Sequence, residues 1–217
     1  MGLRHLDLKE EYRSDRNNIM SEFFYPCMSN CTEYSRCVDF LSLQSLTAIA
    51  MSFANFSSGN AKLRMITGHV FRTRDLDMLE KLFSNKHSRA FDGILIKDTK
   101  MQKLQEAVEN NRIELKIAIP TSEQVTGSFS ERIGIFRDVD GQRVAFTGTS
   151  KESFSTSISD FESVDVFTSW SDKTRVETKV NDFEGLWVNK TKYVNVYDFM
   201  QAYKDNMLKF STDWVFD

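Results

Sequence analysis

The sequence predicts an α/β fold, in which a mixed sheet is flanked by helices on both faces. Two observations lead to this prediction. In the first half of the 217-residue chain, segments with apolar residues at helical spacing alternate with short segments of strand character. This order is typical of parallel strands connected by helices. In the second half, two strand-like segments flank Asp138-Val139-Asp140-Gly141, which ends in the Asp-Gly pair typical of a hairpin turn.

The first half is predicted to run helix, strand, helix, strand, helix, helix, strand. Pro26 stands near the end of the first helix, Gly68 closes the second strand, and Pro120 ends the third. The clearest alternation of faces is in the third strand, which makes it the most secure element. The predicted elements are, in order, a helix at 16–28, a strand at 34–41, a helix at 42–56, a strand at 62–67, helices at 73–83 and 97–111, and a strand at 113–119.

The second half is predicted to contain three strands followed by two helices. The strands lie at 131–136, 143–146 and 163–169, and the helices at 173–187 and about 196–210. Only two prolines and no long Ser/Gly-rich or charged tract interrupt the chain, so no linker is indicated. A single domain is therefore expected over residues 1–217, with 1–15 as an N-terminal extension and 196–217 as a C-terminal helix and tail.

The composition narrows the class of protein. Hydrophobic residues make up 41% of the chain, which is ample for a core, and the net charge of −3 argues against indiscriminate coating of nucleic acid while leaving room for a local basic groove. No signal peptide and no transmembrane helix are expected, which predicts a cytoplasmic protein without membrane contact. Cys27, Cys31 and Cys37 lack a fourth ligand at metal-binding spacing, so they are predicted to be reduced core cysteines.

Three segments carry a resemblance to a known family: Ser128 to Phe136 (SFSERIGIF), Val144 to Ser153 (VAFTGTSKES) and Phe161 to Trp170 (FESVDVFTSW). Together they resemble the C-terminal part of the phospholipase D-like nuclease domain found at the front of bacterial helicase and restriction proteins. That family reads roughly F-H-x-K-x-G-I-F, then D-x-x-G-N, then a-F-x-G-S-x-N-E-s. Pro26 to Leu46 resembles its opening, PALxxSxxYxRaxGYFSSxSL, and Asp182 to Trp187 its close. The resemblance covers about residues 16–210.

The resemblance implies a phosphodiesterase that needs no metal or other cofactor. In the family, one histidine attacks phosphorus and a second protonates the leaving oxygen, while lysine and asparagine hold the non-bridging oxygens. Two chains share the site, which implies a homodimer for active members. Here Ser130 replaces the attacking histidine, Arg132 the lysine and Lys151 the asparagine, while Glu152 keeps its place. The sequence therefore predicts no catalytic residue in this degenerate motif.

Hydroxyl and cationic side chains still remain at the motif. Ser130, Arg132, Thr149 and Lys151 are candidate ligands of phosphate or nucleic acid, because such groups donate hydrogen bonds to anionic oxygens. Strand alternation places Glu131 on the face opposite to Ser130 and Arg132, so it is not expected to activate the serine.

Three hypotheses about function remain open. The first is a DNA- or phosphate-binding or assembly module of a bacterial restriction or phage-defence system, with DNA and a helicase or translocase as partners. The second is an active, metal-independent phosphodiesterase with relocated catalytic residues, for which His69 is the candidate because it follows a predicted strand. The third is a protein-interaction module without a nucleic-acid role.

Overall fold

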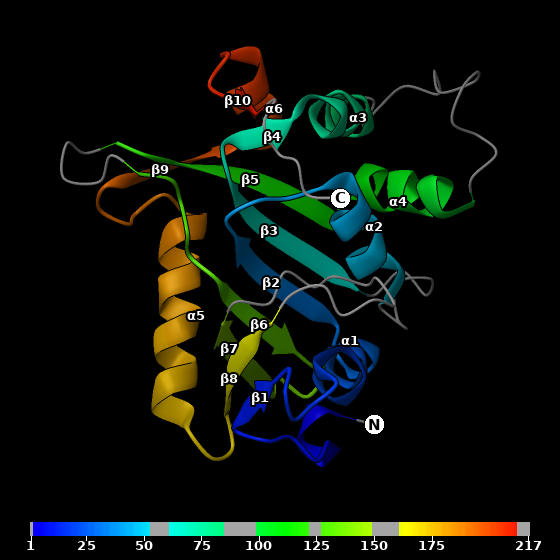
Figure 1. The fold of residues 1–217 in the computed structure, drawn as a ribbon, viewed down its shortest axis with the longest axis vertical. Helices are drawn as coiled ribbons and strands as arrows, with labels where there is room; N and C mark the ends of the chain where they lie inside the picture. The colour runs from blue at the N-terminus through cyan, green and yellow to red at the C-terminus, as the bar shows by residue number, and fades with distance from the viewer. Residues whose placement is uncertain (1, 53–60, 85–98, 122–126, 149–160, 212–217) are drawn as a thin grey trace.

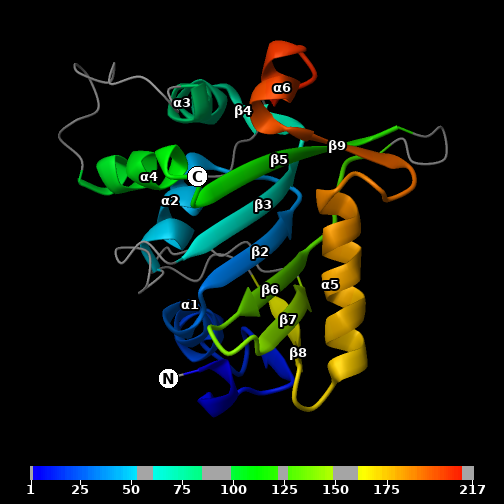
Figure 2. The ribbon, with the colours of Figure 1, turned by 180° about the vertical axis from the view of Figure 1, so that it is seen from behind.

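A computed structural model describes residues 2–52, 61–84, 99–121, 127–148 and 161–211. The chain forms an eight-stranded mixed sheet of strand order β1-β8-β7-β6-β2-β3-β5-β9, and β10 and β4 form a small second sheet (Figure 1). Helices cover both faces of the large sheet, as Figure 2 shows from behind. The predicted α/β class, with a mixed sheet flanked by helices, is confirmed.

The centre of the sheet is parallel, as the first half of the sequence predicted. The strands β2 (Glu33–Val38), β3 (Lys62–Gly68) and β5 (Ile113–Pro120) lie side by side in the same direction. The chain between them forms α2 (Leu43–Ser52), β4 (Val70–Arg72), α3 (Thr73–Ser84) and α4 (Thr99–Glu109).

The second half adds antiparallel strands, as its hairpin signal predicted. β6 (Ile133–Arg137) pairs with β2 and with β7 (Arg143–Gly148), and β8 (Ser163–Thr168) pairs with β7. The buried carboxylate of Asp138 accepts the backbone N–H groups of Asp140 and Gln142, and Gly141 has a φ of 79°. This hydrogen bonding explains the acidic residue at the hairpin by turn chemistry alone.

Two hydrophobic cores lie on the two faces of the sheet. Aromatic and aliphatic residues of α1 (Tyr25–Asn30), α2, α3, α4 and α6 (Phe199–Lys204) fill one core, whereas α5 (Lys173–Trp187) packs on the other face. α5 matches its predicted range, and the Asp172 carboxylate accepts the N–H of Arg175 and so caps its first turn. All three cysteines are buried, as predicted, and burial raises the pKa of each thiol.

The prediction at Pro26 differs from the structure. The first helix runs past this proline, with a π-helical turn η2 (Met20–Phe24) followed directly by α1, which carries Pro26 in its first turn. The N–H of Tyr25 donates to the carbonyl of Met20, five residues back. A proline has no N–H to donate and is well tolerated in the first turn of a helix, so it continues this helix instead of ending it.

The prediction of one long C-terminal helix at 196–210 is wrong. This region forms β9 (Val194–Asp198), the short helix α6 and β10 (Lys209–Ser211), and β9 pairs antiparallel with β5. Backbone pairing with an open sheet edge decides the conformation of Val194 to Asp198, where local sequence is ambiguous. At the other end of the chain, β1 (Glu11–Arg13) pairs with β8, and the turn η1 (Leu3–His5) precedes it.

Strand polarity defines one edge of the large sheet. β2, β3, β5 and β7 end at this edge, while β6, β8 and β9 begin there. The motif residues that precede β6 therefore lie where three parallel strands end, the position at which α/β sheets commonly bind ligands. In the part of the chain that the structure describes, no helix is long and apolar enough to cross a membrane.

Candidate functional site

The structure places part of the predicted site at this edge. Ser130 is exposed and Arg132 half-buried, both immediately before β6. Thr149, Lys151 and Glu152 lie outside the described residues. Glu131 acts on the other face of the sheet, as alternation predicted, since its charge helps burial to raise the pKa of Cys37, which packs in the core beneath α5.

Arg132 forms an ion pair with Asp39, the first residue after β2. Its Nη2 lies 2.5 Å from Oδ2 of Asp39, and the two side chains are 28% and 36% exposed. The backbone N–H of Arg132 donates to the carboxylate of Glu131. Two carboxylates thus contact this residue, but only that of Asp39 contacts the guanidinium among the hydrogen bonds of the described residues.

Arg36 holds the backbone of Arg132 from below. Its Nη1 donates to the carbonyl oxygen of Arg132 at 2.8 Å, and its guanidinium lies over the ring of Phe146, 5.0 Å from the centroid. Arg36 is fully buried. Gly134, its partner on β6, makes room for this packing, because a Cβ at Gly134 would lie 2.0 Å from Phe146 Cζ. A buried cation therefore fixes where the motif strand begins.

Gly68 brings the end of β3 against the same segment. An ideal Cβ on Gly68 would lie 2.6 Å from the carbonyl oxygen of Asp39 and 3.7 Å from that of Phe129. Only glycine allows so close an approach of three chain segments. Ser130 follows Phe129 and His69 follows Gly68, so the chain path brings the alternative histidine of the sequence prediction next to the motif segment.

His69 is a buried, neutral imidazole. Burial, followed by the charge of Lys209, lowers its pKa below the usual value of a histidine. Its Nδ1 is buried and has no hydrogen-bond partner, and the same holds for Oγ1 of Thr67, two residues earlier in β3. These two atoms are unsatisfied polar groups close to the edge, each of which costs about 1–3 kcal/mol when no partner is present.

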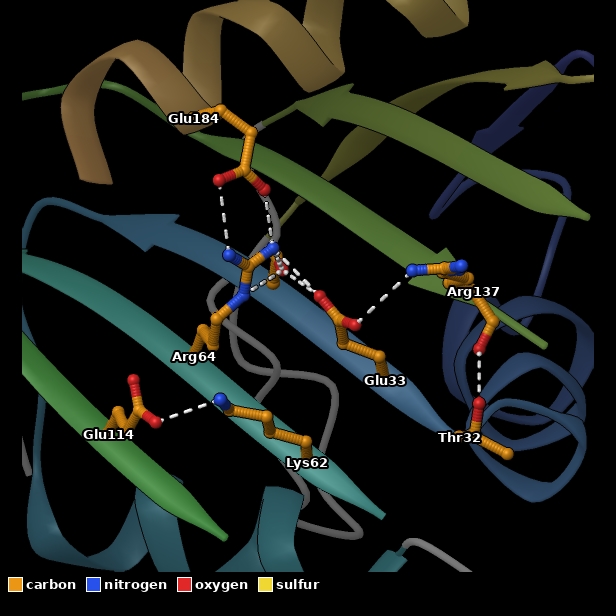
Figure 3. Close-up of polar contacts among 8 residues, drawn as sticks. Thr32, Glu33, Lys62, Arg64, Glu114, Arg137 and Glu184 are labelled. Atoms are coloured by element: carbon orange, nitrogen blue, oxygen red, sulfur yellow. Dashed lines mark hydrogen bonds and ion pairs between the residues drawn. The ribbon is translucent and has the colours of Figure 1, made fainter. Parts of the chain in front are cut away.

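A second arginine–carboxylate cluster lies on the sheet face beneath α5 (Figure 3). Nη2 of Arg64 lies 2.7 Å from Oε1 of Glu33 and 2.6 Å from Oε1 of Glu184. Its guanidinium also donates to Oγ of Ser35 and lies over the rings of Phe183 and Trp187. Sequence analysis assigned no role to this cluster, whose hydrogen bonds hold α5 on the sheet.

The chemistry available at the edge is hydrogen-bond donation to an anion. Arg132 has several N–H groups beyond the one that Asp39 accepts, and Ser130 offers an exposed hydroxyl. Within the described ranges, no hydrogen bond joins Ser130 to a base, and no group of three potential metal ligands is present. The described residues can bind an anionic oxygen, but they contain no activated nucleophile at the motif position.

Two residues of this edge were missed by sequence reasoning, and each had a signal. Arg36 is a charged residue within an otherwise apolar strand, which is typical of a buried, paired cation. Aligning Tyr34 and Arg36 with the Y and R of the family's opening pattern puts Asp39 where that pattern has glycine. A carboxylate in that place adds a negative charge next to the motif.

Comparison with known proteins gives only distant likenesses. No family model matches the chain, and no curated protein sequence matches it significantly. Three solved structures have a similar course of chain. TrmBL2, an archaeal chromatin protein, is 12% identical with a TM-score of 0.42, covering 83% of this chain and 53% of that one. Polyphosphate kinase from Porphyromonas gingivalis is 8% identical with a TM-score of 0.44, covering 81% and 26%.

The third is phosphatidylserine synthase from Haemophilus influenzae, 8% identical with a TM-score of 0.46, covering 86% of this chain and 38% of that one. The chain thus spans about half or less of the length of these proteins. Likenesses at these TM-scores assign neither a family nor an activity to the chain.

Proposed function

We propose that the chain is a phospholipase D-like nuclease domain that has lost its cutting chemistry and binds DNA or another phosphate ester at the edge before β6. The observation that carries the proposal is the position of Arg132, which buried Arg36 anchors through the backbone at the end of the parallel strands. The exposed hydroxyl of Ser130 stands where a nucleophilic histidine would be needed, and an alcohol without a base is a poor nucleophile.

The proposal extends to the biological setting that the family resemblance implies. The chain would serve as an assembly module of a bacterial restriction or phage-defence system in the cytoplasm, with a helicase or translocase as partner or as a fused domain. A homodimer would place two copies of the edge together, as the shared site of active family members requires.

The test is binding of fluorescein-labelled DNA at low salt, where phosphate contacts are strongest. Arg132→Ala should weaken binding about tenfold and reduce the slope of log affinity against log salt by about one. Arg137→Ala is the matched control, because it removes the same charge from the other end of β6, where the side chain is 51% exposed. Equal binding by all three proteins would refute the site, and no binding at low salt would favour the third hypothesis, a protein-interaction module.

A second candidate function is a phosphodiesterase in which His69 supplies the base. The contact of Gly68 with the Phe129 carbonyl favours it, together with the buried and unpartnered Nδ1 of a neutral imidazole. This candidate requires cleavage of DNA in the presence of a chelator, with the activity abolished by His69→Ala and retained by His5→Ala, which changes an exposed histidine. An intact substrate after prolonged incubation with the wild-type protein would exclude it.

A further inference from the structure

The anion site proposed above already holds a carboxylate of its own. Asp39 Oδ2 accepts a hydrogen bond from Nη2 of Arg132 at 2.5 Å, in the position that a phosphate oxygen would take at the same nitrogen. Carboxylate and phosphate are the two groups that the planar guanidinium fork recognises best. An incoming anion therefore meets an arginine that is partly neutralised.

The pair is built into the fold from both sides. The backbone of Asp39 is fixed by close contact with Gly68, where a Cβ would lie 2.6 Å from the Asp39 carbonyl oxygen. The backbone of Arg132 is fixed by the buried guanidinium of Arg36. These two contacts set the separation of the two main chains, so the side chains meet without a long search through rotamers.

The pair is also open to exchange. Its side chains are 28% and 36% exposed, and among the hydrogen bonds of the described residues the Arg132 guanidinium is the one partner of the Asp39 carboxylate. A partly exposed pair with one contact is weak, because water replaces the lost partner at little cost. Arg64, by contrast, contacts two carboxylates and a hydroxyl and is only 15% exposed.

We propose that Asp39 is an internal competitor for the anion and thereby sets the affinity of the site. This inference rests on the proposed function, since it concerns the same Arg132. A phosphate bound to Arg132 would lie next to the Asp39 carboxylate, and two adjacent negative charges repel each other. Binding thus requires the Asp39 side chain to turn away into solvent. Ligands with many phosphates, such as DNA, can offset that cost through further contacts, whereas a single inorganic phosphate cannot.

The test compares Asp39→Asn with the wild-type protein in binding fluorescein-labelled DNA and, separately, inorganic phosphate. Asparagine has the same shape and keeps an oxygen for Arg132, but it lacks the charge. From Coulomb's law for charges about 5 Å apart near a protein surface, Asp39→Asn should bind either anion about five- to twentyfold more tightly. Glu131→Gln is the matched control, because it removes the same charge from the same segment without contacting the guanidinium.

The double variant Asp39→Asn/Arg132→Ala separates local from general electrostatics. If Asp39 acts through Arg132, the gain from Asp39→Asn disappears in the Arg132→Ala background, and Glu131→Gln alone gives a gain of less than about twofold, as expected for screened surface charge. Unchanged or weaker binding by Asp39→Asn would overturn the inference, and weaker binding would show that Asp39 positions Arg132 for the ligand.

The two failures can be told apart. The proposed function fails if DNA binding is absent from the wild-type protein and from Asp39→Asn, or if Arg132→Ala leaves it unchanged. The inference alone fails if DNA binding depends on Arg132 but does not respond to Asp39→Asn. Melting temperatures of all variants within a few degrees of the wild type confirm that the comparison concerns binding, since a surface change of this kind is expected to alter stability little.

Discussion

Two arginine–carboxylate clusters on the same sheet have opposite designs. Arg64 lies on the face beneath α5 (Figure 3), where two carboxylates, a hydroxyl and two aromatic rings use its guanidinium fully. Arg132 lies at the edge before β6, where one carboxylate contacts its guanidinium among the described residues. The first arrangement joins a helix to three strands, whereas the second leaves donors available. The number of partners, more than the presence of charge, separates a structural arginine from a binding one.

The largest effect expected from this comparison is on stability at the Arg64 cluster. Arg64→Ala leaves Glu33 and Glu184 facing each other without a cation, in a place that is only partly open to water. We expect it to lower the free energy of unfolding by about 2–3 kcal/mol, below the 3–5 kcal/mol typical of a fully buried pair. Urea denaturation measures the change, and an effect under about 0.5 kcal/mol would remove the distinction between the two clusters.

Arg132→Ala should have a smaller effect on stability. Its side chain contributes one partly exposed ion pair, which is worth about 0–1 kcal/mol, and the backbone contact with Arg36 survives the substitution. The same urea experiment should therefore give a loss of less than about 1 kcal/mol, while DNA binding falls about tenfold. A loss as large as that of Arg64→Ala would identify Arg132 as structural as well.

The elements that sequence predicts well are those with strong local signals. α5 has a capping aspartate and helical spacing, the β6–β7 hairpin has its Asp-Gly turn, and the parallel order of β2, β3 and β5 follows from the alternation of helices and strands. The short strands β1, β4 and β10 escaped prediction, because three residues carry too little pattern and owe their conformation to the partner strand.

The same division applies to the candidate site. The place of Arg132 follows from its position before a predicted strand, so sequence alone puts it at an edge. The ion pair with Asp39 joins residues 93 positions apart, and the Gly68 contact brings a third segment to the same point. Such long-range contacts depend on strand order, which local patterns do not specify. The charge of Arg132 was predictable, but its partial neutralisation was not.

The third prediction concerns the pH dependence of stability at His69, which lies close to the Arg132 edge. Its folded-state pKa is lowered by burial and by Lys209, so between that pKa and the usual value of about 6.5 the unfolded chain binds more protons. The free energy of unfolding should rise with pH through this window and be fully developed above it. His69→Gln should flatten this part of the pH profile, while His5→Gln, at an exposed site, should not.

This effect is smaller than the first, because a single imidazole contributes and only within a limited pH window. Unfolding by urea at several pH values between about 5 and 8 measures it, with the two variants compared at each pH. If His69→Gln keeps the full slope of the wild-type profile, the imidazole is not the neutral buried group that would suit a base, and the second candidate function loses its main support.

The smallest effect is expected at the rim of the Arg64 cluster. Lys62 Nζ lies 2.8 Å from Oε1 of Glu114, but the two side chains are 46% and 31% exposed (Figure 3). A double-mutant cycle with Lys62→Ala and Glu114→Ala should give a coupling of less than about 0.5 kcal/mol, which high salt removes. The distance is as short as those to Arg64, so a small coupling would show that exposure and the number of partners, and not proximity, determine what a charged pair contributes. A coupling above about 1 kcal/mol would contradict that explanation and extend the structural role to the whole charged face.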